Sequence, residues 1–418
     1  MSEATVNIAT GSTGRADTGA GNPAIDFDPF DPAHQADPYP YYRRLRETAP
    51  VYLSSQGHWI LTRHRDCVAV VRDRRFGHGT GTLIGNNNFR RPVKGRTLPL
   101  ILLDPPEHTR MRTLVSKAFT PRMVSRLAGR IQELVDVMLD QAMDQDEVDL
   151  ISALAYPLPA NVISQMLGVP AEDCDSIKEL SHIVARAVDP DFALSEDEKR
   201  ERNEAFGQFD AYFRELISQR RRQPTEDLLS ELVAARDNGS VLSDNELLST
   251  CILLYVAGHE TTMDLIGNGT LALLRNPDQY ARLREQPDIA ESAVEELLRY
   301  DPPTQITRRT VLEDVEIDGH AIPRGEQVVM IRGAANRDPE VFEDPDRLDL
   351  GRQHNPHIAF DGGIHFCLGA PLARLEGRIV LGTLVRRAPR MALATDQLRY
   401  RKNLVIRGLA ALPVRPRG

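Results

Sequence analysis

Cysteine is scarce in this chain of 418 residues, which contains only Cys67, Cys174, Cys251 and Cys367. No two of them lie within four residues of each other. This spacing gives no support to zinc-knuckle sites or CxxC redox motifs. Because the chain carries no secretion signal, a disulfide framework is not expected either. The function of each cysteine must therefore be argued separately.

Long apolar runs are also missing. The longest plain stretch, CILLYVAG at 251–258, is far shorter than the roughly 20 residues that a membrane-spanning helix needs. Residues 1–25 are rich in Gly, Ser, Thr and Ala and lack the apolar core of a signal peptide, so we expect a disordered tail there. We expect a cytoplasmic protein without a membrane anchor.

An excess of positive charge is absent as well. The formal net charge is −9 and the pI is about 5.7, which argues against a nucleic-acid partner. Apolar residues make up 41% of the chain and charged residues 27%. These fractions are typical of a globular protein, and the length is sufficient for a large core.

The secondary-structure signals are mainly helical. Ser243 and Glu246 form a capping box at the start of a pattern that stops at Asn276-Pro277, which predicts a core helix of roughly 33 residues. Further helices are predicted over 288–300 and 371–388, and two strand-like runs over 311–331. Strands and helices do not alternate, which argues against a Rossmann domain. The predicted fold class is mainly α with small β-sheets.

Cys367 lies in the loop FDGGIHFCLG, residues 360–369. Glycines at 362, 363 and 369 let the backbone approach a flat, bulky group without Cβ clashes. The cysteine also precedes a predicted helix N-terminus, whose N–H groups and dipole favour a thiolate. The residues alone leave three roles open: a small buried apolar side chain, a nucleophile, or an axial ligand of haem iron.

The loop resembles the haem-binding signature of the cytochrome P450 family. Five residues occupy its fixed positions: Phe360, Gly363, His365, Cys367 and Gly369. The resemblance implies haem b as cofactor, with Cys367 as the proximal thiolate ligand of the iron and Phe360, His365 and Gly369 beside the haem.

The resemblance covers residues 31–413, nearly the whole chain, and is closest to soluble bacterial members. It implies one compact cytochrome P450 haem domain over 26–418, and we expect a monomer.

The predicted core helix carries AGHETT at 257–262. From the residues alone this stretch could be a tolerated kink, because a mid-helix threonine commonly bonds the carbonyl four residues back. In the family, the resembling stretch lies over the distal face of the haem. The resemblance implies that Ala257 borders the cofactor, that Thr261 hydrogen-bonds the bound dioxygen, and that Glu260 relays protons through water.

Two supporting sets are also implied by the resemblance. Glu296 and Arg299 match the family's ExxR pair, and Arg347 matches the third member of that buried triad, which supports the cysteine loop; on any helix such an i,i+3 pair is usually a solvated salt bridge. Haem propionates need cationic or donor partners. The candidates are His108, Arg112, Arg309 and His365, and only the register of RTVLED separates Arg309 from its neighbour Arg308.

The family reaction reduces dioxygen with two electrons and inserts one oxygen atom into a substrate, which gives an alcohol or an epoxide. The chain has no flavin or iron–sulfur motif, so a ferredoxin and a ferredoxin reductase that uses NAD(P)H are the expected electron donors. Residues 108–130 contain six Lys or Arg and no Asp or Glu. This segment is either a solvated helix face or, by resemblance, a docking surface for an acidic ferredoxin on the proximal side.

By resemblance, mostly apolar segments supply the substrate pocket: 76–97, 183–191, 303–306, 404–406 and part of the core helix. The individual positions expected to line the pocket are Leu253, Leu254, Ala257, Gly258, Ile306 and Val405. They favour a mid-sized apolar natural product, such as a polyketide, terpenoid or steroid, over a small acid.

Three alternatives stay open. A peroxygenase would take peroxide directly, but family members of that kind lack the acid–alcohol pair present here as Glu260-Thr261. A non-catalytic haem sensor or carrier would not need a proton relay. A helical cysteine hydrolase would be colourless, and its activity would depend on a thiol and not on oxygen.

Overall fold

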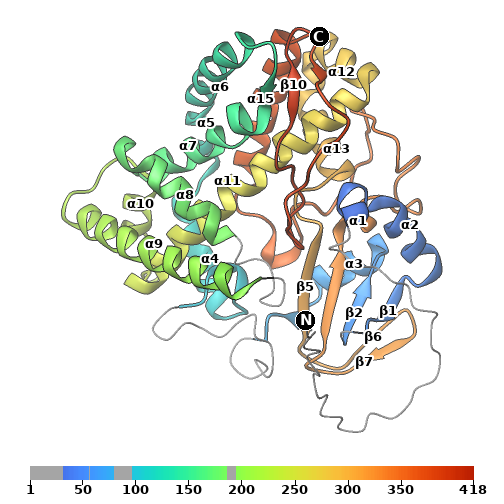
Figure 1. The fold of residues 1–418 in the computed structure, drawn as a ribbon. Helices are drawn as coiled ribbons and strands as arrows, with labels where there is room; N and C mark the ends of the chain where they lie inside the picture. Colours follow the sequence, from blue (N-terminus) through green and yellow to red (C-terminus); the bar gives the residue numbers. More distant parts are fainter. Residues whose placement is uncertain (1–31, 56, 80–96, 186–193) are drawn as a thin grey trace, which may run out of the picture.

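The computed structural model describes residues 32–55, 57–79, 97–185 and 194–418 (Figure 1). The predicted tail at 1–25, most of the segment 76–97 and most of 183–191 lie outside the described residues. No helix in the described ranges is both long enough and apolar enough to cross a membrane.

Helices account for most of the described chain. The α-helices are α1 (Pro32–Ala36), α2 (Tyr39–Thr48), α3 (His64–Arg72), α4 (Glu107–Ala118), α5 (Pro121–Arg126), α6 (Ala128–Met143), α7 (Pro157–Met166), α8 (Cys174–Ala185), α9 (Glu196–Arg222), α10 (Leu228–Ala234), α11 (Asp244–Arg275), α12 (Pro277–Glu285), α13 (Ala290–Tyr300), α14 (Arg332–Ala335) and α15 (Ala370–Arg387). Short 3₁₀ or π turns are η2 (Leu100–Leu102), η3 (Ile151–Ala155), η4 (Ala171–Asp173), η7 (Pro287–Ile289) and η8 (Gly363–His365). The predicted helices over 288–300 and 371–388 are confirmed as α13 and α15.

Helix α11 runs through the middle of the molecule and packs against α7, α8, α9, α13 and α15 (Figure 1). The predicted capping box is present: the Ser243 side chain accepts the Glu246 N–H, and the Glu246 side chain accepts the Ser243 N–H. The helix ends at Arg275, because Pro277 cannot continue it. Its C-terminal half is buried on all sides, as expected for a helix inside a large core.

Within the described residues, the strands form sheets of five, three and two strands, which lie in different parts of the molecule (Figure 1). They are β1 (Val51–Leu53), β2 (His58–Leu61), β3 (Phe76–Gly77), β4 (Val148–Asp149), β5 (Ile306–Val311), β6 (Val315–Ile317), β7 (His320–Ile322), β8 (Gln327–Ile331), β9 (Ala392–Leu393) and β10 (Pro413–Arg415). The largest sheet has the order β1-β2-β8-β5-β3, in which β2 and β8 are parallel and the other pairs antiparallel.

The region 311–331 contains more strands than the two runs predicted. Strands β6 and β7 form a hairpin whose turn residues Asp318 and Gly319 both have positive φ, at 49° and 77°. Such a turn suits a two-residue hairpin. Strand β8 then follows and joins the main sheet. Strands β6 and β7 are each only three residues long, and the turn between them lies at Asp318-Gly319, where the sequence has a turn signal.

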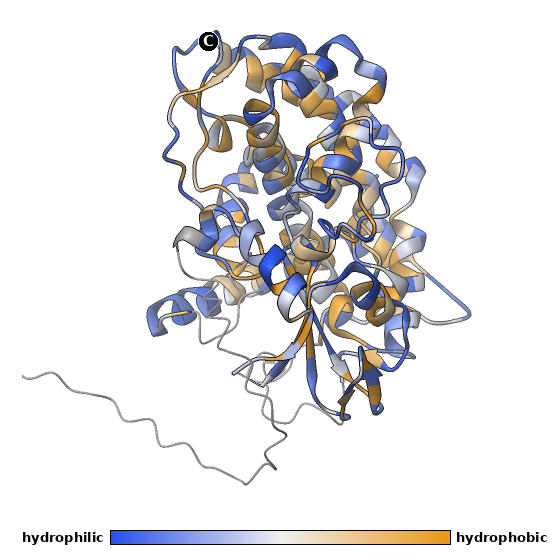
Figure 2. Ribbon diagram, turned by 90° about the vertical axis from the view of Figure 1, so that its right-hand side faces the viewer, coloured by the Kyte–Doolittle hydropathy of each residue, from blue (hydrophilic) through white to orange (hydrophobic). Residues whose placement is uncertain are grey.

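Most buried apolar side chains form one large cluster between the helices, and a smaller cluster lies between the main sheet and α3. Figure 2 shows that hydrophobic and hydrophilic residues alternate along the helices, as expected for helices that bury one face in this core. The chain is therefore one compact domain, mainly α with small β-sheets, as predicted.

Candidate active site

The cysteine loop places Cys367 between η8 and the N-terminus of α15. The Cys367 N–H donates to the carbonyl of Phe360 (2.9 Å), which fixes the turn. Burial raises the pKa of the Cys367 thiol, and the backbone N–H groups of Gly369 and Ala370 together with the Arg112 guanidinium act in the opposite direction. The two N–H groups and the guanidinium charge therefore favour the thiolate form, which is the form that binds a metal cation.

Two of the loop's glycines serve packing and not access to a flat group. A Cβ on Gly363, whose φ is +59°, would lie 2.1 Å from the carbonyl oxygen of Val71, and one on Gly362 would lie 2.8 Å from the Val71 side chain. The expectation that both glycines face a bulky ligand is therefore wrong, because α3 packs directly against them. At Gly369 there is still room for a bulky ligand: a Cβ there would have one neighbour within 4 Å, Cys367 Sγ at 3.9 Å.

The structure brings the four candidate propionate partners to one end of the cysteine loop. His108 and Arg112 lie one turn apart on α4, and the His108 and His365 rings are 4.5 Å apart between centroids. Arg112 also donates to the carbonyl of Phe366 (2.8 Å). Burial, and secondly the charge of Arg309, lowers the pKa of His365 to about 4.

Several polar atoms at this end are buried without a partner. Both ring nitrogens of His108 and Nε2 of His365 have no hydrogen-bond partner among the described residues. Buried polar groups in native proteins are nearly always paired. We therefore expect these imidazoles to donate hydrogen bonds to a further acceptor. The His78 ring, 4.8 Å from that of His365, adds a residue that the sequence motifs did not indicate.

The register of β5 supports Arg309 over Arg308. Arg309 is buried and pairs with Val328 of β8, whereas Arg308 is half-buried. Arg309 donates to Asp361 (2.9 Å), and Arg332 donates to the same carboxylate oxygen (2.6 Å).

The Asp361 carboxylate thus lies between two buried guanidiniums. Asp361 has a φ of 64°, a conformation that aspartate tolerates better than most residues. No sequence motif pointed to Arg332, which precedes the loop by about thirty residues and is brought to Asp361 only by the fold.

Glu296 and Arg299 of α13 form a fully buried ion pair. Arg299 Nε and Nη2 donate to the two oxygens of Glu296 at 2.7 and 2.8 Å, and neither side chain is exposed. Arg299 Nη1 also donates to the carbonyls of Asn336 (3.0 Å) and Pro345 (2.7 Å). The pair therefore ties α13 to the chain that leads into the cysteine loop.

The third member of this network is Arg352, which corrects the prediction of Arg347. Arg352 Nε donates to Glu296 (3.1 Å), and both side chains are largely or fully buried. Arg347 has an exposed side chain and contributes its backbone carbonyl, which accepts from Arg299 (3.2 Å). The two arginines are five residues apart in one irregular segment, so the sequence could not show which side chain turns inward.

The neighbouring Glu295 makes a second connection to the cysteine loop. It receives two hydrogen bonds from Arg374 of α15, at 2.7 and 2.8 Å, and lies 3.2 Å from His357. Burial would raise the pKa of Glu295, but the bonds from Arg374 and His357 lower it to about 2. The Arg374 guanidinium also stacks on Phe360, 4.6 Å from the ring centroid.

On α11, Ala257 and Thr261 lie on one face. Ala257 is exposed although its neighbours Tyr255 and His259 are buried, so this face of α11 is not covered by other described side chains. The Thr261 hydroxyl donates to the Ala257 carbonyl (2.8 Å), which is the bond predicted for a mid-helix threonine. Glu260 is 1% exposed and points elsewhere, toward Arg401 of the C-terminal segment (2.5 Å).

The expected substrate positions divide into two groups. Ile306 and Val405 lie on segments that the structure brings together, since the Gln305 N–H donates to the Val405 carbonyl (3.0 Å). Leu253, Leu254 and Ala257 are partly or fully exposed on α11. Gly258 was predicted wrongly: a Cβ there would pack against Ile163 of α7 at 3.3 Å, so this position faces another helix.

These features fit a haem held by a thiolate. The anion-favouring donors around Cys367, the unpartnered imidazoles of His108 and His365, and the open faces at Gly369 and Ala257 meet the needs of iron, propionates and a flat ring. Within the described ranges, no group of three or more His, Cys, Asp or Glu side chains offers an alternative metal site.

Comparison with known proteins decides the family. A family model described as "Cytochrome P450" matches residues 42–388. The chain belongs to the cytochrome P450 family. It is 41% identical to the biotin biosynthesis cytochrome P450 of Bacillus subtilis over 90% of this chain and 96% of that protein. It is 40% identical to the vitamin D(3) 25-hydroxylase of Pseudonocardia autotrophica over 93% and 96% of the two chains.

Solved structures of cytochromes P450 share the fold. P450BioI in complex with acyl carrier protein carrying hexadec-9Z-enoic acid has a TM-score of 0.86 at 40% identity, covering 92% of this chain and 99% of that one. CYP109E1 of Bacillus megaterium in complex with testosterone has a TM-score of 0.82 at 34% identity, covering 91% and 100%. This cytochrome P450 is thus a haem-thiolate monooxygenase, an oxidoreductase that uses molecular oxygen.

Proposed function

We propose that Cys367 is the proximal thiolate ligand of a haem b, and that the enzyme hydroxylates or epoxidises a mid-sized apolar compound with electrons from a ferredoxin. The observation that carries the proposal is the environment of the sulfur: the N–H groups of Gly369 and Ala370 and the positive charge of Arg112 favour an anionic Cys367 Sγ, and a Cβ on Gly369 would meet no other neighbour within 4 Å. His108, Arg112, Arg309 and His365 would hold the propionates. The cofactor supplies oxygen activation, and an electron-rich thiolate favours cleavage of the O–O bond.

On the side of the cofactor opposite Cys367, the protein's own residues would deliver protons. Thr261 carries a hydroxyl at the open face of α11, and Glu260 is the adjacent buried acid. An acid next to an alcohol can pass protons inward while the core excludes bulk water. This pair also favours a monooxygenase that uses O₂ over a peroxygenase, which has no need of such a relay.

Replacing Thr261 with alanine is expected to divert electrons from product to hydrogen peroxide. Reductant consumption should stay within about twofold while product per reductant falls about tenfold, because a misplaced proton supply lowers productive oxygen cleavage. The measurement is the ratio of product and peroxide to NAD(P)H consumed. Thr262→Ala is the matched control, since Thr262 makes the same kind of bond to Gly258 (3.1 Å) but is buried. Equal coupling in wild type and T261A would contradict the role of Thr261.

The electron donor is proposed to dock on the basic segment 108–130. Internal ion pairs occupy part of its charge: Arg110 bonds Glu246, Lys117 bonds Asp237 (2.6 Å), and Arg130 bonds Glu133 (3.1 Å). Arg122 and Arg126 of α5 are exposed, and α5 packs against α15, which begins next to Cys367. These two arginines are the best candidates for contact with an acidic ferredoxin.

Reversing both charges, R122E with R126E, should slow the first electron transfer about tenfold at low ionic strength. Because salt screens such steering, the difference should shrink as the salt concentration rises. Stopped-flow reduction under carbon monoxide measures this rate. Arg44→Glu, an exposed site on α2, is the control. A flat salt profile, or equal rates in both variants, would argue against docking at α5.

An apolar substrate is supported by the chain and by its relatives. Leu253, Leu254, Ile306 and Val405 present apolar side chains, and the relatives above are named for vitamin D(3) or were solved with testosterone or a fatty acyl chain. The proposed function is tested by screening such compounds for displacement of the water ligand in the optical spectrum. Binders are then turned over with a surrogate ferredoxin, its reductase and ¹⁸O₂. Product carrying one ¹⁸O atom is expected; binding without any oxygenated product would contradict the proposal.

A further inference from the structure

Three buried charges join the cysteine loop to two other elements. Asp361 belongs to the loop, Arg309 to β5 and Arg332 to α14. Nη2 of Arg309 (2.9 Å) and Nη2 of Arg332 (2.6 Å) both donate to Oδ2 of Asp361. The side chains of Arg309, Arg332 and Asp361 are only 4%, 8% and 11% exposed. One carboxylate therefore lies between two buried cations that would otherwise repel each other.

The backbone at residue 361 would suit glycine better than aspartate. The φ of Asp361 is 64°, in the left-handed region that glycine adopts without steric cost and that aspartate tolerates at some cost. The loop has glycine at the next two positions, 362 and 363. A side chain in such a conformation persists when its surroundings hold it there, and it points to a role for the group concerned. At this position that group is the carboxylate.

The carboxylate also helps to fix the turn that carries Cys367. Oδ1 of Asp361 accepts the N–H of Gly362 (2.8 Å), while Oδ2 accepts the two guanidiniums. The peptide bond between Phe360 and Asp361 carries the carbonyl that accepts the Cys367 N–H (2.9 Å). Asp361 therefore links the acceptor that orients Cys367 to β5 and α14.

Arg309 keeps donors to spare after binding Asp361. A guanidinium has five N–H groups. Nη1 donates to the Thr307 hydroxyl (3.2 Å) and to the Arg308 carbonyl (2.9 Å), and Nη2 gives one N–H to Asp361. Two N–H groups, including that of Nε, have no acceptor among the described residues. The bond to Asp361 thus orients the guanidinium and leaves two donors for the carboxylate of a ligand.

The charges of this cluster act at the proposed cofactor site. Burial raises the pKa of Cys367, and the charge of Arg332 is among the influences that lower it. Burial, and secondly the charge of Arg309, lowers the pKa of His365 to about 4, and the charge of Asp361 acts in the opposite direction. A change of one unit charge in the cluster should therefore be felt at the sulfur ligand and at a proposed propionate partner.

We propose that Asp361 is a positioning residue for the haem, which orients Arg309 toward a propionate and lowers the reduction potential of the bound iron through its negative charge. This inference rests on the proposed function, in which Cys367 holds the iron and Arg309 holds a propionate. A nearby negative charge stabilises the oxidised iron, which is the more positive form, relative to the reduced iron. Asp361 would thus set how readily the electron donor reduces the enzyme.

The test is a spectroelectrochemical titration of the holoenzyme. Asp361→Asn keeps the shape of the side chain and tolerates the same φ, but it removes the charge. The reduction equilibrium should shift about tenfold toward reduced iron, which is about 59 mV for a one-electron couple. Arg332→Gln removes a positive charge from the same carboxylate oxygen, so its potential should move by a similar amount in the opposite direction.

The double variant D361N/R332Q separates charge from structure. It restores the balance of charge, so its potential should return to the wild-type value. If the single variants acted through damage to the fold, their effects would add or grow in the double variant instead of cancelling.

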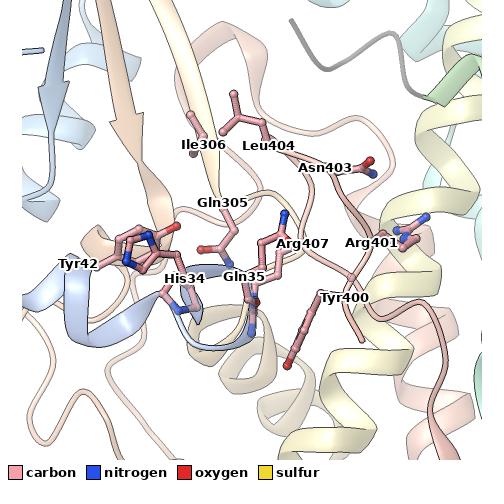
Figure 3. A pocket seen from close by; sticks show the side chains of 12 residues that line it. His34, Gln35, Tyr42, Gln305, Ile306, Tyr400, Arg401, Asn403, Leu404 and Arg407 are labelled. Carbon is pink, nitrogen blue, oxygen red and sulfur yellow. The ribbon is translucent and has the colours of Figure 1, made fainter. Parts of the chain in front are cut away.

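Asp301→Asn is the matched control, because Asp301 forms a comparable ion pair away from the cysteine loop. It accepts from Nε of Arg407 (3.0 Å), and the two side chains are 12% and 9% exposed. Figure 3 shows Arg407 in a small pocket with Tyr400, whose ring centroid lies 4.1 Å from the guanidinium carbon. D301N and D361N should both unfold at lower urea concentration than wild type, but only D361N should shift the potential.

The outcomes separate this inference from the proposed function. Wild-type potentials in D361N and R332Q, shifts of both in one direction, or an equal shift in D301N would overturn the role of Asp361. If D361N does not fold, Asp361→Gly, which suits a φ of 64°, removes the same charge and should give the same shift. A wild-type protein without a thiolate-haem spectrum would overturn the proposed function as well, whereas that spectrum with unshifted potentials overturns this inference alone.

Discussion

Replacing Cys367 with serine should abolish the thiolate signature and nearly all product formation. The hydroxyl of serine does not ionise under the donors that favour a Cys367 thiolate, the N–H groups of Gly369 and Ala370 and the charge of Arg112. Without an electron-rich ligand, the O–O bond is cleaved poorly. The fold should survive, because the loop is fixed by its backbone bond from residue 367 to Phe360 and by α3.

The measurement on C367S combines circular dichroism, haem content and the spectrum of the reduced carbon monoxide complex. Cys174→Ser is the matched control, because Cys174 is the other half-buried free cysteine and lies in a different part of the chain. C174S should match wild type in all three measurements. If C367S kept the thiolate spectrum and the wild-type rate, the assignment of the ligand to Cys367 would be wrong.

Replacing Arg299 with methionine should destabilise the protein by about 3 to 5 kcal/mol, the usual cost of leaving one partner of a buried ion pair alone. Arg299 is completely buried and serves Glu296 together with the carbonyls of Asn336, Pro345 and Arg347. Its removal leaves all of these acceptors short of a donor. Since they lie on the chain leading to Cys367, haem retention should fall along with stability.

Urea unfolding and haem content measure the effect of R299M. Arg347→Met is the matched control: its exposed side chain is absent from the network, and its carbonyl remains in place. R347M should therefore stay within about 0.5 kcal/mol of wild type, as surface substitutions usually do. If R347M lowered stability as much as R299M, it would be wrong to assign Arg352, and not Arg347, as the third member of the network with Glu296 and Arg299.

Local signals in the sequence predicted much of the site. The capping box at Ser243 and Glu246 located the start of α11, and the glycine-rich stretch FDGGIHFCLG located the cysteine loop. Ala257, Thr261 and Cys367 all belong to short continuous motifs. Such residues can be predicted because their geometry depends on neighbours in the chain.

Residues that act through tertiary contacts could not be predicted in the same way. Arg401 lies 141 residues from Glu260, and no local pattern relates the two. Arg352 and Arg347 compete for one role within a segment that has no regular period. His78 directly follows β3 and carries no motif. Each was found only because the fold brings it against a buried partner.

Charge counting also needed correction by the structure. The segment 108–130 has six cations in sequence, but Glu246, Asp237 and Glu133 pair with three of them. Asp237 and Glu246 lie far along the chain from this segment, and Glu133 lies one turn beyond Arg130 on α6, so all three fall outside the residues that were counted. The surface available for a redox partner is therefore narrower, centred on Arg122 and Arg126.

The central claim, that Cys367 binds haem iron as a thiolate, is tested most directly by the absorption spectrum of the purified protein, reduced under carbon monoxide. We expect the strongly red-shifted Soret band that gives the family its name. A colourless protein after expression with added haem, or a band like that of histidine-ligated haem in every preparation, would contradict the claim.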